Sequence, residues 1–229
     1  MSGLFITLEG TEGGGKTTQM ALLAQRLRAL GRTVRSLREP GGTPIGEEIR
    51  HLLKHSEENR AMTAEAELLL MNASRAQLVR EVIRPALDAG EIVLCDRFYD
   101  STIAYQGYGR ELDLKAVQAL ISFAAGDTRP HLTLLLMVPV VVSENRRLHR
   151  QTSLSLASAQ EPPGSSGSLP AAQVRDRMEE ADRHFFERVE KGYRAIAETE
   201  FKRIRLIDAT QSVAAVSARI WELTAPLLT

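Results

Sequence analysis

Short apolar runs alternate along the chain with longer segments in which apolar residues recur every three or four positions. A short run of apolar residues is typical of a buried strand, whereas the longer spacing is typical of a helix with one apolar face. Their alternation predicts parallel strands joined by helices that cover both faces of one sheet. The predicted strands are residues 4–9, 33–38, 91–96, 132–138 and 203–208. We therefore expect an α/β fold with a five-stranded parallel sheet, formed by residues 1–229 as a single domain.

Helical spacing extends over several of the longer segments. Three of them end at a glycine, which tolerates the left-handed backbone conformation that often terminates a helix: residues 17–31, 63–90 and 113–126. Thr63 and Asp113 stand where an N-cap is expected, and Pro85 predicts a bend in the second helix. Residues 213–228 are also apolar at helical spacing, and we assign them to the core.

Residues 10–18, GTEGGGKTT, follow the first predicted strand and open the first predicted helix. They satisfy the pattern GxxxxGK(S/T), in which glycines let backbone amides surround phosphate oxygens at a helix N-terminus. Lys16 can reach the terminal phosphates, and the Thr17 hydroxyl can ligate Mg²⁺. The pattern predicts a site for ATP and Mg²⁺. The residues assigned to it are Gly10, Thr11, Gly13, Gly14, Gly15, Lys16, Thr17 and Thr18.

Glu12 is a carboxylate in the middle of this phosphate loop. A triphosphate would repel it, so we expect Glu12 to face away from the donor, toward a second ligand that offers a hydroxyl.

Asp96 and Arg97 follow directly on the third predicted strand. In open α/β sheets ligands bind at the carboxyl ends of the strands, so Asp96 is placed to hold the metal or its waters. The cation of Arg97 beside it predicts a second phosphate. Transfer between two phosphorylated ligands is therefore favoured over hydrolysis, and the absence of an NKxD pattern disfavours a GTPase.

Charge and composition exclude several other classes of protein. The 29 basic and 29 acidic residues balance, which gives no overall positive field for a nucleic acid. The single cysteine, Cys95, lies in an apolar run, so we expect a buried inert thiol, with neither a disulfide within the chain nor a cysteine-based zinc cluster. The longest apolar stretch, residues 132–142, is too short to cross a bilayer. With no export signal at its start, we expect a soluble cytoplasmic protein.

Residues 151–172 are rich in serine and proline and contain no lysine or arginine. Such a segment cannot bury enough apolar surface to order itself, which predicts mobility. Arginines precede and follow it, including Arg146 and Arg150. A passive linker is one interpretation; a lid over residues 143–178 that closes on the triphosphate is the other.

Five segments together resemble bacterial thymidylate kinase, in order and over nearly the full chain: FITLEGTEGGGKTT, REPGGTPIGEEIR, ASRAQLV, DRFYDSTIAYQGYGR and IDAT. The resemblance implies an α/β nucleoside monophosphate kinase fold. It also implies phosphorylation of dTMP to dTDP with ATP and Mg²⁺, and a homodimer.

The same resemblance implies roles for individual residues around the acceptor. Arg97 would bind the acceptor phosphate, Tyr105 would exclude a 2′-hydroxyl, and Glu12 would bond the 3′-hydroxyl. Arg75 would donate to a thymine carbonyl, with Thr102 and Gln106 contacting the rest of the base edge. The residues assigned to the acceptor are Glu12, Arg38, Glu39, Pro40, Arg50, Met71, Arg75, Arg97, Thr102, Tyr105 and Gln106. Arg38 and Arg50 are alternatively ordinary solvated arginines, with Arg50 the better candidate.

Two positions depart from the family pattern. Met71 stands where the family commonly has a phenylalanine that stacks on thymine; it can cover the ring itself, or it is a core residue and Phe98 takes that role. Some members carry an arginine in the phosphate loop where this chain has Gly13. The resemblance therefore implies that Arg146 and Arg150 supply the transition-state cation alongside the catalytic Lys16 and Arg97. Asp208 and Ala209 would flank the adenine.

Two alternatives to a thymidylate kinase stay open from the sequence. One is a related kinase for another nucleoside or base, which Met71 permits. The other is a regulatory switch that binds ATP without a small acceptor, which the REPGGT and DRFYDSTIAYQG segments disfavour because a switch has no second-substrate pocket.

Overall fold

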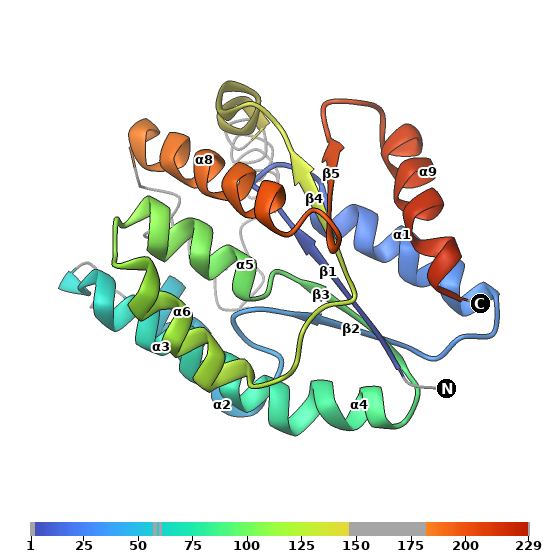
Figure 1. Cartoon of the computed structure of the whole chain (residues 1–229), viewed down its shortest axis with the longest axis horizontal. Coiled ribbons are helices and arrows are strands. Elements are labelled where there is room, and N and C mark those ends of the chain that lie inside the picture. Colours follow the sequence, from blue (N-terminus) through green and yellow to red (C-terminus); the bar gives the residue numbers. More distant parts are fainter. Residues whose placement is uncertain (1–2, 57–58, 60, 147–181, 229) are drawn as a thin grey trace, which may run out of the picture.

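The computed structural model describes residues 3–56, 59, 61–146 and 182–228. Its core is a five-stranded parallel sheet with the strand order β2-β3-β1-β4-β5. The strands confirm the five predicted ones to within one residue at either end: β1 (Leu4–Glu9), β2 (Val34–Arg38), β3 (Ile92–Asp96), β4 (Leu132–Met137) and β5 (Ile204–Asp208). Figure 1 shows the sheet between two layers of helices.

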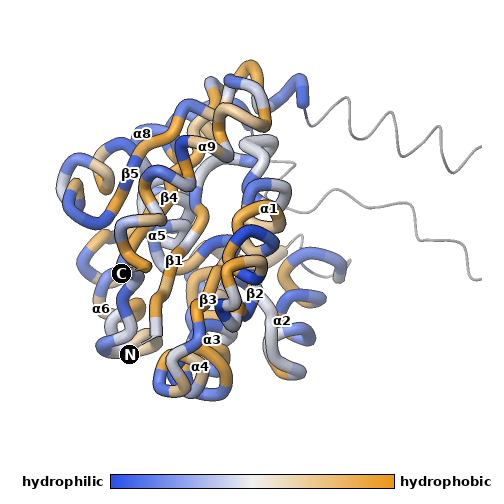
Figure 2. Tube along the Cα trace, turned by 90° about the vertical axis from the view of Figure 1, so that its right-hand side faces the viewer, coloured by the Kyte–Doolittle hydropathy of each residue, from blue (hydrophilic) through white to orange (hydrophobic). Residues whose placement is uncertain are grey.

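One face of the sheet is covered by α1 (Lys16–Ala29) and α9 (Val213–Thr224), which pack against each other and on side chains such as Ile6 and Leu8 of β1. The intervening strand residues, such as Phe5, point to the opposite face. Both faces of β3 are therefore apolar, with Ile92 and Leu94 on one side and Val93 and Cys95 on the other, as a strand buried on both sides requires. On β1 the face of Phe5 also carries the buried polar residues Thr7 and Glu9. Figure 2 shows the hydropathy of the residues along these strands.

The helices on the opposite side carry the acceptor-side residues. They are α2 (Pro44–Lys54), α3 (Ala64–Leu78), η2 (Val79–Ile83), α4 (Arg84–Asp88), α5 (Tyr99–Thr102), η3 (Ile103–Gly109), α6 (Leu114–Ala125) and α8 (Arg183–Thr199). A short 3₁₀ turn, η4 (Ala225–Leu228), follows α9, and residues 140–146 are helical. Neither α2 nor α8 was among the helices predicted from the spacing.

The two predicted N-caps are confirmed. The Thr63 hydroxyl accepts a hydrogen bond from the backbone N–H of Ala66, and the Asp113 carboxylate caps α6 in the same way. Between α3 and α4 the helix passes through the π-helical turn η2 directly before Pro85. Proline lacks an N–H and its ring clashes with the carbonyl four residues earlier, so the irregularity falls in the preceding turn.

Cys95, the longest apolar stretch and the predicted lid were the other features singled out from composition. Cys95 is buried in the core, and burial raises the pKa of its thiol well above the ordinary value. Among the described residues, no helix has the length and apolar character needed to span a bilayer. Of the predicted lid, residues 147–178 lie outside the described residues, and so do the 151–172 segment and Arg150.

Candidate active site

A cavity opens at the carboxyl ends of β1, β2 and β3, which are neighbours in the sheet. The loop after β1 holds the phosphate-binding glycines, the loop after β2 leads into α2, and the loop after β3 leads into α5. Every residue assigned to the acceptor from the sequence lines this cavity: Glu12, Arg38, Glu39, Pro40, Arg50, Met71, Arg75, Arg97, Thr102, Tyr105 and Gln106. Their roles toward a ligand stay predictions.

The phosphate loop wraps tightly at the end of β1. Gly10 has a φ of 125°, and a Cβ there would lie 1.9 Å from the carbonyl oxygen of Leu136, so only glycine fits. Lys16 is buried, and its Nζ donates to the carbonyls of Gly10 (3.1 Å) and Thr11 (2.9 Å). Burial, followed by repulsion from Arg97, lowers the pKa of Lys16 to about 8. A bound phosphate would favour the charged form of this lysine.

The two residues expected to hold Mg²⁺ lie side by side. The Thr17 hydroxyl donates to Oδ2 of Asp96 at 2.9 Å, from α1 to the end of β3. Hydroxyl and carboxylate oxygens are the hard ligands that Mg²⁺ prefers. Within the described residues, no group of three or more histidine, cysteine or acidic side chains could hold a metal alone. The pair therefore fits a magnesium ion that takes its other ligands from phosphates and water.

Arg97 connects the phosphate loop to the acceptor cavity. Its backbone is left-handed, with a φ of 72°, which is uncommon for a residue other than glycine. Nη1 donates to the carbonyl of Gly10 (3.1 Å) and the hydroxyl of Tyr193 (3.2 Å), and Nη2 donates to the hydroxyl of Tyr105 (3.2 Å). The guanidinium is thus held in one orientation before any ligand binds.

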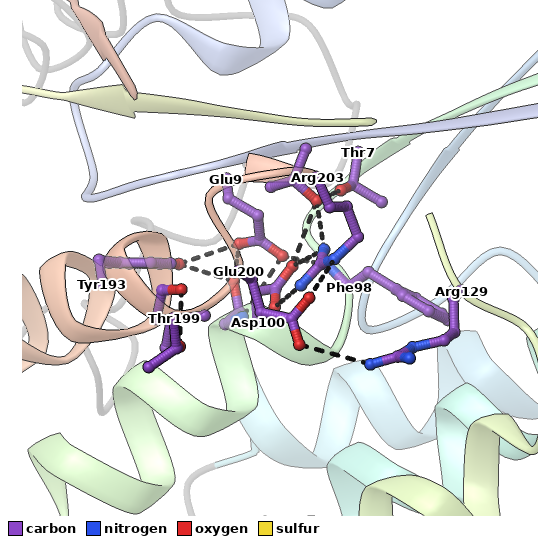
Figure 3. Close-up of polar contacts among 12 residues, drawn as sticks. Thr7, Glu9, Phe98, Asp100, Arg129, Tyr193, Thr199, Glu200 and Arg203 are labelled. Carbon is purple, nitrogen blue, oxygen red and sulfur yellow. Dashed lines mark hydrogen bonds and ion pairs between the residues drawn. The ribbon is translucent and has the colours of Figure 1, made fainter. Parts of the chain in front are cut away.

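Glu9, which the sequence analysis did not assign to the site, anchors this turn. Its Oε1 accepts hydrogen bonds from the backbone N–H of Phe98 (2.7 Å) and of Ser101 (3.3 Å) at the start of α5. Its Oε2 accepts from the hydroxyls of Ser101 (2.5 Å) and Tyr193 (3.0 Å), and Figure 3 shows Glu9 and Tyr193 pointing toward each other. Glu9 therefore supplies the N-terminal cap that α5 lacks locally.

Burial and the neighbouring charge of Asp100 raise the pKa of Glu9 to about 7, although Ser101, Arg97 and the Phe98 amide oppose the shift. Asp100 itself is paired. Arg203, just before β5, donates from Nη1 (2.7 Å) and Nη2 (2.9 Å) to its two carboxylate oxygens. This bidentate pair ties α5, which follows Arg97, to the start of β5, the edge strand of the sheet.

Arg75 is almost fully buried, with 2% of its surface exposed, and its guanidinium is surrounded by acceptors. Nε (2.9 Å) and Nη2 (2.7 Å) donate to Oε2 of Glu39, Nη2 also donates to Thr102 Oγ1 (2.9 Å), and Nη1 donates to Asn72 Oδ1 (3.1 Å). Burial raises the pKa of Glu39, and Arg75 opposes that shift. The arginine expected to contact the base is therefore fixed by partners from α3, α5 and the loop after β2.

Met71 and Phe98 both line the cavity, Met71 half-buried and Phe98 without exposed surface. The position of Met71 in the cavity wall favours its interpretation as a ligand contact over that of a core residue. Phe98 packs edge-on against Phe5, and the guanidinium carbon of Arg75 lies 5.4 Å from its ring centroid. Met71 therefore has exposed surface that could cover a base, whereas Phe98 has none in this structure.

Other arginines assigned from the sequence already have polar partners. Arg38 pairs with Glu47 at 2.8 Å, and Arg50 donates to the carbonyl of Pro40 at 2.9 Å. Arg146 donates from Nη1 to the carbonyls of Gly13 (2.9 Å) and Ala209 (3.1 Å).

Arg146 therefore joins the phosphate loop to the turn after β5, where the adenine was expected. The exposed Asp208 accepts hydrogen bonds from the backbone N–H (2.9 Å) and hydroxyl (2.6 Å) of Thr210, and Ala209 is buried.

A sequence model described as thymidylate kinase matches residues 8–220. The chain belongs to the thymidylate kinase family. A thymidylate kinase of Syntrophotalea carbinolica is 47% identical over 224 residues, which are 98% of this chain and 96% of that protein. A thymidylate kinase of Pseudomonas syringae pv. tomato is also 47% identical, over 228 residues, which are 100% of this chain and 98% of that protein.

The fold agrees with that of a solved thymidylate kinase. The crystal structure of the enzyme from Ehrlichia chaffeensis matches with a TM-score of 0.72 and 30% identity, covering 98% of this chain and 99% of that one. The five-stranded parallel sheet with helices on both faces is therefore the P-loop kinase fold, and as a thymidylate kinase the chain is a nucleoside monophosphate kinase.

Proposed function

We propose that the protein transfers the terminal phosphate of ATP to dTMP, which yields ADP and dTDP. The observation that carries this proposal is the cavity beside the phosphate loop, because Glu12 and Arg97 line it while Lys16 lies in the same loop. A donor and an acceptor bound at these places would share one short stretch of protein, and an ATP-binding switch would have no use for such a second pocket.

Phosphoryl transfer asks the protein mainly to align two ligands and to neutralise charge on the moving group. In this proposal Lys16 and the loop amides bind the donor phosphates. Arg97, held by the hydroxyls of Tyr105 and Tyr193, binds the acceptor phosphate and keeps it pointed toward the donor. Arg146 and Arg150 remain candidates for the cation that stabilises the transferred group.

Acceptor recognition is proposed to use both ends of dTMP. Glu12 accepts a hydrogen bond from the 3′-hydroxyl, and the Tyr105 ring fills the space that a 2′-hydroxyl would need. Arg75 donates to a carbonyl of the base, and Thr102 and Gln106 contact the adjacent edge. A site built to hydrogen-bond a particular base edge rejects a mismatched one strongly, because the mismatch leaves buried polar groups unpaired.

Thr17 and Asp96 would hold Mg²⁺, and the ion would supply positive charge that neutralises the phosphates when bound. The fit of their oxygens to a hard cation supports this part of the proposal. The adenine is proposed to lie beside Asp208 and Ala209. As in the resemblance described above, we propose a homodimer.

The test is ADP release from ATP and Mg²⁺ with a panel of acceptors: dTMP, dUMP, dCMP, UMP, CMP, AMP, GMP and thymidine. We expect dTMP to give the highest kcat/KM. Preference for another base would assign the chain to a different substrate, and no stimulation by any acceptor would favour the regulatory switch.

A further inference from the structure

Glu67 is an acidic side chain of α3 with 1% of its surface exposed, and it lies behind the base-contacting residues. Its Oε1 accepts a hydrogen bond from Nε2 of Gln106 at 2.8 Å. Gln106, from η3, is itself 1% exposed and lines the acceptor cavity. Since a carboxylate can only accept, this contact fixes the Gln106 amide with its NH₂ toward Glu67. The carbonyl oxygen Oε1 of Gln106 is thereby left for a ligand in the cavity.

Arg110 donates hydrogen bonds to both carboxylate oxygens of Glu67. Its Nη2 lies 3.0 Å from Oε2 of Glu67, and its Nε lies 3.3 Å from Oε1. The guanidinium also stacks on Phe185, 4.7 Å from the ring centroid. The order of contacts is therefore Arg110 to Glu67 to Gln106 to the cavity, and each contact has one allowed direction.

The hydrogen bonds of Arg75 show which of its N–H groups is left for a base. A guanidinium has five N–H groups, and four of those on Arg75 are donated to Glu39, Asn72 and Thr102. Within the part of the chain that the structure describes, this leaves one N–H on Nη1 without an acceptor, on a side chain that lines the cavity. The Thr102 hydroxyl can donate or accept, so it does not discriminate between one base edge and another. The cavity thus presents one fixed donor, from Arg75, and one fixed acceptor, from Gln106.

We propose that Glu67 is a positioning residue that sets the orientation of the Gln106 amide, and that it thereby selects an imide base edge over an amino-pyrimidine edge. This inference rests on the proposed function. Thymine and uracil offer a carbonyl acceptor next to an N–H donor, which complements Arg75 and Gln106. Cytosine offers an amino donor next to a ring-nitrogen acceptor, which places donor against donor and acceptor against acceptor.

Glu67→Gln tests the proposal with a change of one atom. The shorter contact of Arg110 is to Oε2 (3.0 Å), whereas Oε1 receives Gln106, so the oxygen of the new amide should face Nη2 of Arg110 and its NH₂ should face Gln106. The Gln106 amide should then rotate and present its own NH₂ to the base. We expect the ratio of kcat/KM for dTMP to kcat/KM for dCMP to fall about ten- to a hundredfold, the effect expected from one mispaired buried group.

Two internal controls distinguish a change in the orientation of the Gln106 amide from a general loss of packing. The ratio of kcat/KM for dTMP to kcat/KM for dUMP should stay unchanged in Glu67→Gln, because both bases carry the same imide edge. A loss of packing would instead lower kcat/KM for dTMP, dUMP and dCMP alike. Glu65→Gln makes the same chemical change at an exposed position on α3 and should leave every ratio unchanged. The double variant Glu67→Gln with Gln106→Glu restores an acceptor toward the base and should recover the preference for dTMP.

An unchanged dTMP to dCMP ratio in folded Glu67→Gln would overturn the proposal. Wild-type protein inactive on dTMP would instead overturn the proposed function, so the two failures are distinguishable. If Glu67→Gln does not fold, NMR of the wild type decides. The Gln106 side-chain NH₂ should be protected from solvent exchange both with and without dTMP, and an NH₂ that is protected only when dTMP is bound would contradict its contact with Glu67.

Discussion

The donor half and the acceptor half of the proposed site are built in different ways. The donor half consists largely of backbone: the glycines of the phosphate loop, the exposed Thr17 and the turn at Asp208. The acceptor half consists of buried polar side chains that already have partners: Arg75 donates to Glu39, and Gln106 donates to Glu67. A triphosphate can be bound by amides and a lysine, whereas discrimination between bases needs fixed donors and acceptors. Arg97 and Glu12 lie where the halves meet.

This difference predicts that substitutions in the donor half spare acceptor binding. Lys16→Met should lower kcat by about 10³-fold, because the removed charge faces the phosphate that moves. The Kd for dTMP, measured by calorimetry without ATP, should stay within about threefold, since the hydrogen bonds of Lys16 to described residues go to the loop carbonyls of Gly10 and Thr11. A large loss of dTMP affinity would show that the halves are not separate.

Substitution of Arg97, by contrast, should affect the functions of both halves, phosphoryl transfer and dTMP binding. Arg97→Lys keeps the charge but loses the planar fork that reaches Gly10, Tyr193 and Tyr105. We expect kcat/KM for dTMP to fall about a hundredfold, with both kcat and KM affected. Arg38→Lys, at a residue exposed in the same cavity, is the matched control and should change kcat/KM far less. Equal effects of the two variants would remove the special role of Arg97.

Tyr105 offers a test on the sugar. Tyr105→Ala should raise the activity on UMP relative to dUMP by about tenfold, because the ring that would exclude a 2′-hydroxyl is gone. Tyr105→Phe keeps the ring and should keep the preference for the deoxy sugar, while it loses the bond to Arg97. A deoxy preference that survives the alanine change would assign the exclusion to another residue.

Stability should depend on pH through Glu9. Its pKa is raised from 4.5 to about 7 in the folded protein, so between these values the folded state retains a proton that the unfolded chain has released. The free energy of unfolding should therefore fall as pH rises from about 4.5 to about 7, by on the order of 3 kcal/mol from this group. Urea denaturation of wild type and Glu9→Gln measures it, with the exposed Glu65→Gln as control. Parallel pH dependence in wild type and Glu9→Gln would contradict the assignment.

The strands, the phosphate loop and most of the residues that line the acceptor cavity could be predicted from the sequence, because each depends on a local pattern or a run of motif residues; Lys54 and Ser101, which also line it, were not predicted. The partners of the predicted residues could not be found in this way. Tyr193 lies 184 positions from Glu9, and Arg110 lies 43 positions from Glu67, so no spacing connects them. Glu9 did carry a local signal: it is an acid at the end of the apolar strand LFITLE, directly before Gly10.

The central claim is that one loop serves both ligands, with its amides and Lys16 binding the donor and Glu12 binding the acceptor sugar. The most direct test compares dTMP with its 3′-deoxy analogue in wild type and in Glu12→Ala. We predict that the wild type prefers dTMP by about ten- to a hundredfold in kcat/KM, the value of a hydrogen bond to a charged group. That preference should vanish in Glu12→Ala. A preference for dTMP that stays the same in both proteins would contradict the account.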